Sequence, residues 1–109
     1  MKMVQAIIRP ERFERVKKAL ENKNIIPMTS LDIRGRGEQK GIALEFRGSY
    51  IRVDDLPKVE IDLVVESRDV DMVVDTICHA ARTGKHGDGK IFIIPMERMA
   101  RVRTDEEWA

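Results

Sequence analysis

The order strand, helix, strand occurs twice in the hydrophobic pattern of this chain, and that repetition limits the possible folds more than any other feature. The first unit has a predicted strand at 3–9, a helix at 10–22 that begins with a proline, and an alternating strand at 28–34. The second unit repeats the plan. Its strand, helix and strand are predicted at 59–65, 69–82 and 91–94.

Two such units in succession predict an α+β fold, the ferredoxin-like βαββαβ arrangement in which two helices cover one face of a sheet. At 109 residues the chain is one domain, long enough to bury a core. The other face of the sheet would carry Asp32, Lys58, Glu60 and Asp62. A charged open face is ordinary for an antiparallel sheet, and it becomes an interior if subunits assemble around it.

Composition excludes several classes of function. The formal net charge is +1 although 36% of the residues are charged, so no bulk field directs the chain to nucleic acid or to a membrane surface. The single cysteine excludes an internal disulfide, and no apolar run approaches the ~18 residues of a membrane span. The first residues form a strand pattern without the cleavage site of a signal peptide. We therefore expect a cytoplasmic protein without direct membrane insertion.

Residues 35–55, between the two units, have no clean periodicity. A loop of this length inside a small domain is usually functional or disordered. An extended hairpin is the alternative, because 42–46 and 50–53 have some strand character. We favour a mobile recognition arm.

The segment 83–92 places three glycines, two lysines and a threonine between the second helix and the last strand. Closely spaced glycines let successive backbone N–H groups form an anion-binding concavity, and a lysine at its rim suits phosphate. The competing interpretation is a simple turn after a helix, with Gly84 in the left-handed conformation. The spacing from Gly84 to Lys90 fits a P-loop, but Ile91 replaces the required Ser or Thr and the helix comes first. The segment therefore predicts a phosphate site that is not a P-loop.

Five blocks in register along almost the whole chain resemble the PII family of nitrogen-regulatory signalling proteins. These blocks are Ala6-Ile7-Ile8-Arg9-Pro10, Gly35-x-Gly37-x-Gln39-Lys40-Gly41, Leu56-Pro57-Lys58-Val59, Thr83 to Phe92, and Arg101-Val102-Arg103-Thr104. In this family the second block forms the base of a long target-binding T-loop, the fourth is the B-loop and the fifth is the C-terminal loop. On this resemblance 1–109 is a single PII-type domain, with the T-loop at about 36–55, the B-loop at 82–90 and the C-terminal loop at 100–109.

The resemblance implies a compact homotrimer that binds nucleotide between its subunits and is not an enzyme. ATP and ADP would compete there, and 2-oxoglutarate would join ATP through Mg²⁺, with no tightly bound cofactor. The ligands would set the conformation of the T-loop by favouring one of its states. The loop would then dock on a target, which is an ammonium channel, a glutamine-metabolism enzyme or nitrogenase.

The resemblance also assigns roles residue by residue. The backbone of Gly87, Asp88 and Gly89 and the ammonium of Lys90 would hold the phosphates. The other nucleotide-binding positions would be Ile7, Thr29, Gly35, Gly37, Glu38, Gln39, Val64, Arg101 and Arg103. The 2-oxoglutarate site would comprise Gln39, Gly41, Lys58 and Gly87, and Gln39 would give magnesium an amide oxygen, a hard ligand that suits this ion.

Some of these residues have a simpler interpretation when the resemblance is set aside. Ile7, Thr29 and Val64, which would line the adenine pocket, are also ordinary residues for a sheet, and Lys58 is an ordinary surface lysine. A short strand is predicted at 100–103, where Arg101 and Arg103 at i,i+2 would point to the same side and could face one anion across a subunit boundary. Alone, such a pair more often marks a solvated edge.

Two positions depart from the family pattern. Many members have arginine where this chain has Glu38, and a carboxylate aimed at a triphosphate would be repelled, so Glu38 should turn away and contribute only its backbone. In nucleotidylated members the T-loop ends in a modified tyrosine. This chain has Ile51 there and Tyr50 one position earlier, which turns the hydroxyl to the opposite side and argues against modification of Tyr50.

Three alternative functions remain to be weighed. A PII-like regulator of nitrogenase that acts with a paralogue suits a T-loop without the modifiable tyrosine. An acylphosphatase-like enzyme on the same fold would need an anion loop after the first strand, where the chain has Arg9-Pro10 and no glycine. An RNA-binding module would need aromatic residues on central strands, but aromatic residues are only 5% of this chain, so no nucleic acid partner is expected.

Overall fold

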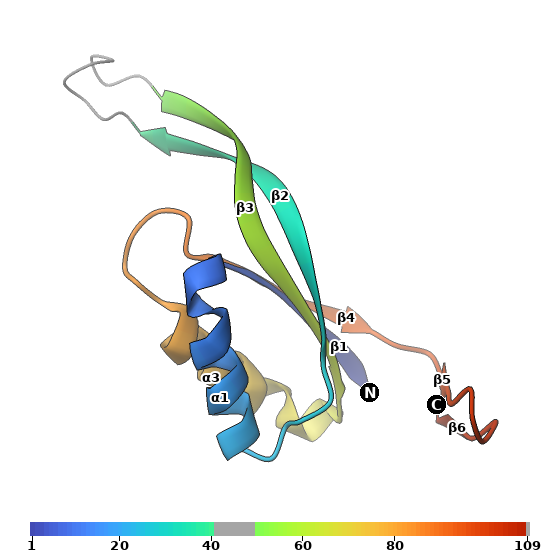
Figure 1. Cartoon of the computed structure of the whole chain (residues 1–109). Coiled ribbons are helices and arrows are strands. Elements are labelled where there is room, and N and C mark those ends of the chain that lie inside the picture. The colour runs from blue at the N-terminus through green and yellow to red at the C-terminus, as the bar shows by residue number, and fades with distance from the viewer. Residues whose placement is uncertain (41–49, 109) are drawn as a thin grey trace.

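The structure is a computed structural model that describes residues 1–40 and 50–108, with the backbone alone at 37–40, 50–54 and 108. Each half of the predicted plan contains one helix between its two strands, and a turn of 3-10 helix leads into it (Figure 1). The elements are β1 Lys2–Ile8, η1 Pro10–Arg12, α1 Phe13–Asn22, β2 Thr29–Lys40, β3 Tyr50–Val65, η2 Ser67–Asp69, α3 Val70–Ala81, β4 Gly89–Pro95, β5 Met99–Ala100 and β6 Glu107–Trp108. This order confirms the predicted α+β, ferredoxin-like plan.

The main sheet has four strands in the order β2-β3-β1-β4, and its neighbouring strands are antiparallel. The central strand β1 pairs along its full length with β3, from Lys2 opposite Val65 to Ile8 opposite Val59. It pairs equally with β4, so that Ile8 also lies opposite Gly89. The carboxyl end of β1 is therefore held between the beginning of β4 and the middle of β3, and the candidate site forms there.

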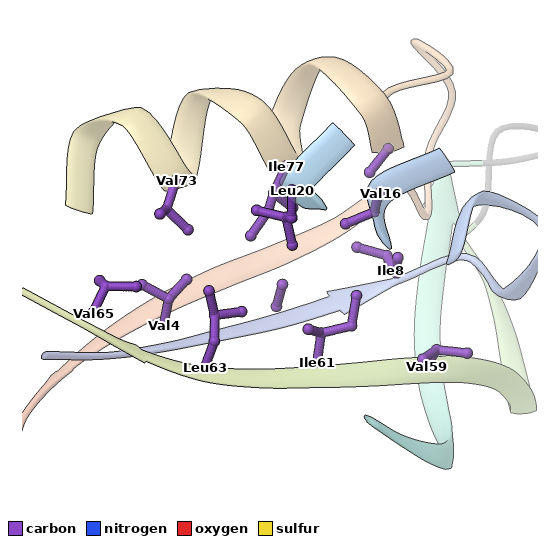
Figure 2. Packing of buried hydrophobic residues seen from close by; sticks show 12 residues of the cluster. Val4, Ile8, Val16, Leu20, Val59, Ile61, Leu63, Val65, Val73 and Ile77 are labelled. Atoms are coloured by element: carbon purple, nitrogen blue, oxygen red, sulfur yellow. The ribbon is translucent and has the colours of Figure 1, made fainter. Parts of the chain in front are cut away.

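Both helices lie on one face of the sheet and enclose the core between them and the strands (Figure 2). Every second residue of β1 and of the second half of β3 points into this core, as the alternation predicted. Leu20 of α1 and Ile77 of α3 are completely buried, and such a side chain contributes about 2 kcal/mol by its removal from water. The buried residues are Val4, Ala6, Ile8, Val16, Leu20, Val59, Ile61, Leu63, Val65, Val73, Ile77 and Ala81.

The face of the sheet away from the helices, called the open face below, is more apolar than predicted. The register pairs Asp32 with Val59, which is buried under the helices, so Asp32 lies on the helix side and its predicted place on the open face is wrong. Leu31 lies opposite Glu60 and takes that place, with 44% of its surface exposed. The alternation of 28–34 predicted a strand correctly, but alternation alone does not say which set of residues faces the helices.

The segment 35–55 has more regular structure than the favoured prediction allowed. Pairing of β2 with β3 continues past a bulge between Gly35 and Gly37 and reaches Lys40 opposite Tyr50. The two strands form a hairpin that projects well beyond the helices and gives the molecule a length of 58 Å (Figure 1). The alternative of an extended hairpin is therefore correct in that 50–53 form a strand, which pairs with 37–40, whereas the other predicted strand, 42–46, lies outside the described residues.

The chain after β4 does not form the predicted strand at 100–103. Only Met99 and Ala100 are extended, and they pair with Trp108 and Glu107. Residues 102–104 form a turn between these two short strands, closed by a hydrogen bond from the N–H of Asp105 to the carbonyl of Arg101 (2.9 Å). Arg101 and Arg103 are thus not neighbours on one face of a strand, which corrects the geometric argument for that pair.

Candidate functional site

Residues 82–88 connect α3 to β4 and are called the glycine loop below. Gly84 (φ 87°) and Gly87 (φ 91°) adopt left-handed backbone conformations that other residues rarely take. Gly89, the first residue of β4, is required for a second reason: a Cβ atom there would lie 1.8 Å from the carbonyl oxygen of Ile7. The glycines thus form a tight turn and let β4 begin directly against the end of β1.

The carboxylate of Asp88 holds the glycine loop in shape. Its Oδ2 accepts hydrogen bonds from the backbone N–H groups of Thr83 (2.9 Å) and Gly84 (2.8 Å). Its Oδ1 accepts from the hydroxyl of Thr83 and from Nε of Arg9 (3.1 Å). Because these donors favour the ionised form, the Thr83 hydroxyl above all, the pKa of Asp88 lies well below its ordinary value.

Two cations converge on the loop beside Gly87. Arg9, which follows β1, donates from Nη2 to the carbonyl of His86, and Lys58 of β3 donates from Nζ to the carbonyl of Gly87. A Cβ atom on Gly87 would lie 3.4 Å from Nη2 of Arg9 and 3.6 Å from Nζ of Lys58. Partial burial and, second, the charge of Arg9 lower the pKa of Lys58.

This arrangement favours an anion. Arg9 and Lys58 bring two positive charges to one place, and the neighbouring carboxylates of Asp88 (3.1 Å) and of the exposed Glu11 (4.0 Å) both lie against Arg9. A carboxylate or phosphate oxygen next to Lys58 would offset the repulsion by Arg9, which after burial is the second cause of its lowered pKa. Sequence reasoning missed Arg9 as a site residue. The available signal was its position directly after a central strand and before the proline of a helix.

The structure brings the first group of predicted site residues together at this end of the sheet. Ile7 lies opposite Lys90 of β4 and opposite Glu60 of β3. A Cβ atom on Gly35 would lie 4.0 Å from Cγ of Lys58, so the base of the hairpin reaches the same place. The predicted residues that meet here are Ile7, Gly35, Lys58, Gly87, Asp88, Gly89 and Lys90.

A second group of predicted residues lies at the other end of the open face. Val64 is opposite Met3, four residues before Ile7 in β1, and thus about 13 Å away from it along the strand. Thr29, Val64 and Arg101 line one cavity of about 800 Å³ between the start of β2, the end of β3 and the C-terminal segment. Arg103 is exposed in the turn that follows. Within one chain, the two groups do not form a single site.

The remaining predicted residues are described only in part. Gly37, Glu38 and Gln39 belong to β2, opposite Val53, Arg52 and Ile51, and the structure describes their backbone alone. Gly41 lies outside the described residues, and Tyr50 is described only as the first residue of β3. The direction of the Glu38 and Tyr50 side chains and the proposed magnesium ligand Gln39 therefore stay predictions.

The described residues show neither a metal-binding cluster nor a membrane-spanning helix. Among them, no cluster of three or more His, Cys, Asp or Glu is arranged to hold a metal ion. None of the described helices is long and apolar enough to span a membrane.

The fold and site define a small ferredoxin-like protein with a projecting hairpin and, at its base, a glycine loop on which two cations converge. The sequence also identifies the family. The pattern of the family Nitrogen regulatory protein P-II matches residues 1–106, and the chain belongs to this family. Nitrogen regulatory protein P-II of Microchaete diplosiphon is 52% identical over 107 residues, which cover 98% of this chain and 96% of the relative. Nitrogen regulatory protein P-II 2 of Methanothermobacter thermautotrophicus is 51% identical over 106 residues, 97% and 92% of the two chains.

A solved structure agrees with the sequence relatives. The chain is similar to Arabidopsis thaliana PII bound to citrate, with a TM-score of 0.78 and 36% identity over 98% of this chain and 87% of that one. The predicted membership of the PII family and the predicted fold are thus confirmed. The relatives are named as regulatory proteins, which fits a signalling role without catalytic turnover.

Proposed function

We propose that this chain is a cytoplasmic, non-catalytic sensor that binds ATP or ADP and 2-oxoglutarate and regulates a nitrogen-metabolism protein through its hairpin. The observation that carries the proposal is the convergence of Arg9 and Lys58 on the glycine loop. The loop would supply backbone N–H groups for phosphate and Lys90 of β4 an ammonium, while Lys58 would supply a cation for a carboxylate. A carboxylate ligand also has a precedent, since the similar Arabidopsis protein was bound to citrate.

The proposed nucleotide site would need more than one copy of the chain. The two groups of predicted site residues lie about 13 Å apart on the open face. A neighbouring copy could bring its Thr29, Val64, Arg101 and Arg103 to the Ile7, Gly35 and Lys90 of the first. We therefore propose a homotrimer in which each nucleotide lies between two subunits.

The open face supports assembly of this kind. Val64, Phe92 and Ile94 expose 36–44% of their surfaces there, an apolar area that further copies of the chain would cover. Oδ1 of Asp62 is also buried without a hydrogen-bond partner among the described residues, as expected if a donor comes from another copy. Hydrogen bonding to Asp62 raises the pKa of Glu60 beside it.

The residues have separate roles in the proposed sensor. Lys90 and the backbone at 87–89 would hold the phosphates, and Lys58 would hold one carboxylate of 2-oxoglutarate. Magnesium would supply a charge that joins the phosphates to 2-oxoglutarate, and the amide oxygen of Gln39 suits it as a ligand. Because Gln39 lies in β2 and Lys58 in β3, ligand binding would act directly on both strands of the hairpin. The hairpin would then dock on its target or leave it.

Calorimetric titration of ATP with magnesium, with and without 2-oxoglutarate, tests the proposal. We expect 2-oxoglutarate to strengthen ATP binding, since the two ligands share one site. Lys58→Ala should abolish this coupling and preserve ADP binding. Lys17→Ala, which removes an exposed lysine of α1, is the matched control and should behave as the unchanged protein. Absence of nucleotide binding in the unchanged protein would contradict the proposed function.

A further inference from the structure

We propose that Asp88 is a positioning residue: its carboxylate does not meet the ligand but fixes the glycine loop and Arg9 in the geometry that binds the anion. This inference rests on the proposed function for its consequence, although the arrangement itself is seen in the structure. The resemblance to the PII family assigns Asp88 only a backbone N–H group that would bind phosphate, and gives its carboxylate no role.

The acceptor capacity of the Asp88 side chain is already used within the protein. A carboxylate has about four lone-pair positions on its two oxygens, and here four donors occupy them. Two are backbone N–H groups, one is a hydroxyl and one is a guanidinium. The carboxylate therefore has no position left for a ligand hydroxyl or for a metal ion unless one of these bonds breaks.

These bonds connect the two ends of the loop and join them to the sheet. Thr83 and Gly84 lie at the beginning of the glycine loop and Asp88 at its end, so the carboxylate closes the turn. Arg9 adds the connection to β1, because its Nε bonds to Asp88 while its Nη2 bonds to the carbonyl of His86. One guanidinium thus contacts two points of the loop, and Asp88 orients it.

The positioning role predicts an effect opposite to that of simple charge. A carboxylate close to an anion site repels the anion, so its neutralisation should strengthen binding if charge alone mattered. If Asp88 acts by position, Asp88→Asn should weaken binding even though it removes a negative charge. Asparagine can still accept from the two backbone N–H groups, but its NH₂ group cannot accept from Thr83 and Arg9.

Four variants of the full-length protein test this inference. Asp88→Asn removes the charge, and Thr83→Val removes the hydroxyl that Asp88 accepts from, whereas Thr83→Ser keeps that hydroxyl. Asp75→Asn removes an exposed carboxylate from α3 and is the matched control for charge. The dissociation constant for ATP is measured by calorimetry. Amide hydrogen exchange of residues 83–89 is measured without nucleotide, which reports on loop order independently of binding.

We expect Asp88→Asn and Thr83→Val to weaken ATP binding about tenfold, the size expected for the loss of one hydrogen bond to a charged group. Both should also accelerate exchange in 83–89, while Thr83→Ser and Asp75→Asn stay within about twofold of the unchanged protein. ATP binding by Asp88→Asn that is equal or tighter would overturn the positioning role and leave the proposed function intact. Failure of the unchanged protein to bind ATP would overturn the proposed function. In that case the exchange rates still decide whether Asp88 orders the loop, and unchanged exchange in Asp88→Asn would refute this.

Discussion

Gly89→Ala is expected to destabilise the protein far more than alanine at any other glycine of the turn. Its Cβ atom would lie 1.8 Å from the carbonyl oxygen and 2.9 Å from the carbonyl carbon of Ile7, and 3.2 Å from Cα of Ile8. All three atoms belong to the backbone of the central strand, so no side chain can rotate to make room. The beginning of β4 must move away from β1.

The size of the effect follows from two contributions. The positive φ of 122° costs an alanine about 1 kcal/mol. Separation of the strands removes the pairing of Gly89 with Ile8 and of Lys90 with Ile7, and each lost hydrogen bond costs about 1 kcal/mol. We therefore expect the free energy of unfolding to fall by about 3 kcal/mol.

Gly84→Ala is the matched control for this prediction. Gly84 has a similarly positive φ of 87°, but an added Cβ atom would have no atom within 4 Å. Its substitution should cost only about 1 kcal/mol, the backbone contribution. The difference of about 2 kcal/mol corresponds to a melting temperature roughly 10 °C lower for Gly89→Ala in a protein of this size. The measurement is calorimetric unfolding of both variants at one protein concentration. Equal melting temperatures would show that the close approach of β4 to β1 is not needed for stability.

Two further predictions concern the ligand and the assembly. Because the pKa of Lys58 is below its ordinary value of 10.5, its charge is lost at a lower pH than that of a free lysine. Binding of 2-oxoglutarate should therefore weaken as the pH rises toward 10.5. Titrations at several pH values should show that Lys58→Arg, which stays charged, removes this dependence. A parallel decline of binding in both proteins would exclude Lys58 as the titrating group. Phe92→Asp places a charge on the open face, where Phe92 lies opposite Gln5 and is 44% exposed, and should give monomers in light-scattering measurements. Ile26→Asp, at a residue 61% exposed outside the sheet, is its control and should leave the proposed trimer intact. A Phe92→Asp protein that is still trimeric would place the interface elsewhere.

Periodicity in the sequence was sufficient to locate the regular elements. Alternation placed Val59, Ile61, Leu63 and Val65 correctly on the buried face of one strand, and helical spacing placed Val73 and Ile77 in the core. Alternation placed Asp32 on the wrong face of the sheet. Which residues of an edge strand face the helices depends on its register with the neighbouring strand, and the sequence of the edge strand does not encode that register. The favoured prediction for 35–55 was a mobile arm and not the projecting hairpin of β2 and β3. The paired residues there have mixed polarity on both faces, so their pairing leaves no periodic pattern in the sequence.

The sequence by itself determined the fold class, the family and the position of the glycine-rich turn, because each depends on local spacing of apolar residues, glycines and lysines. Only the tertiary structure decided which side chains act on that turn. Arg9 and Asp88 are 79 residues apart and Lys58 and Gly87 are 29 apart, and they meet because β3 and β4 both pair with β1. No local pattern records such a meeting, since hydrogen bonds and charge act over a few ångströms in space and do not depend on distance along the chain.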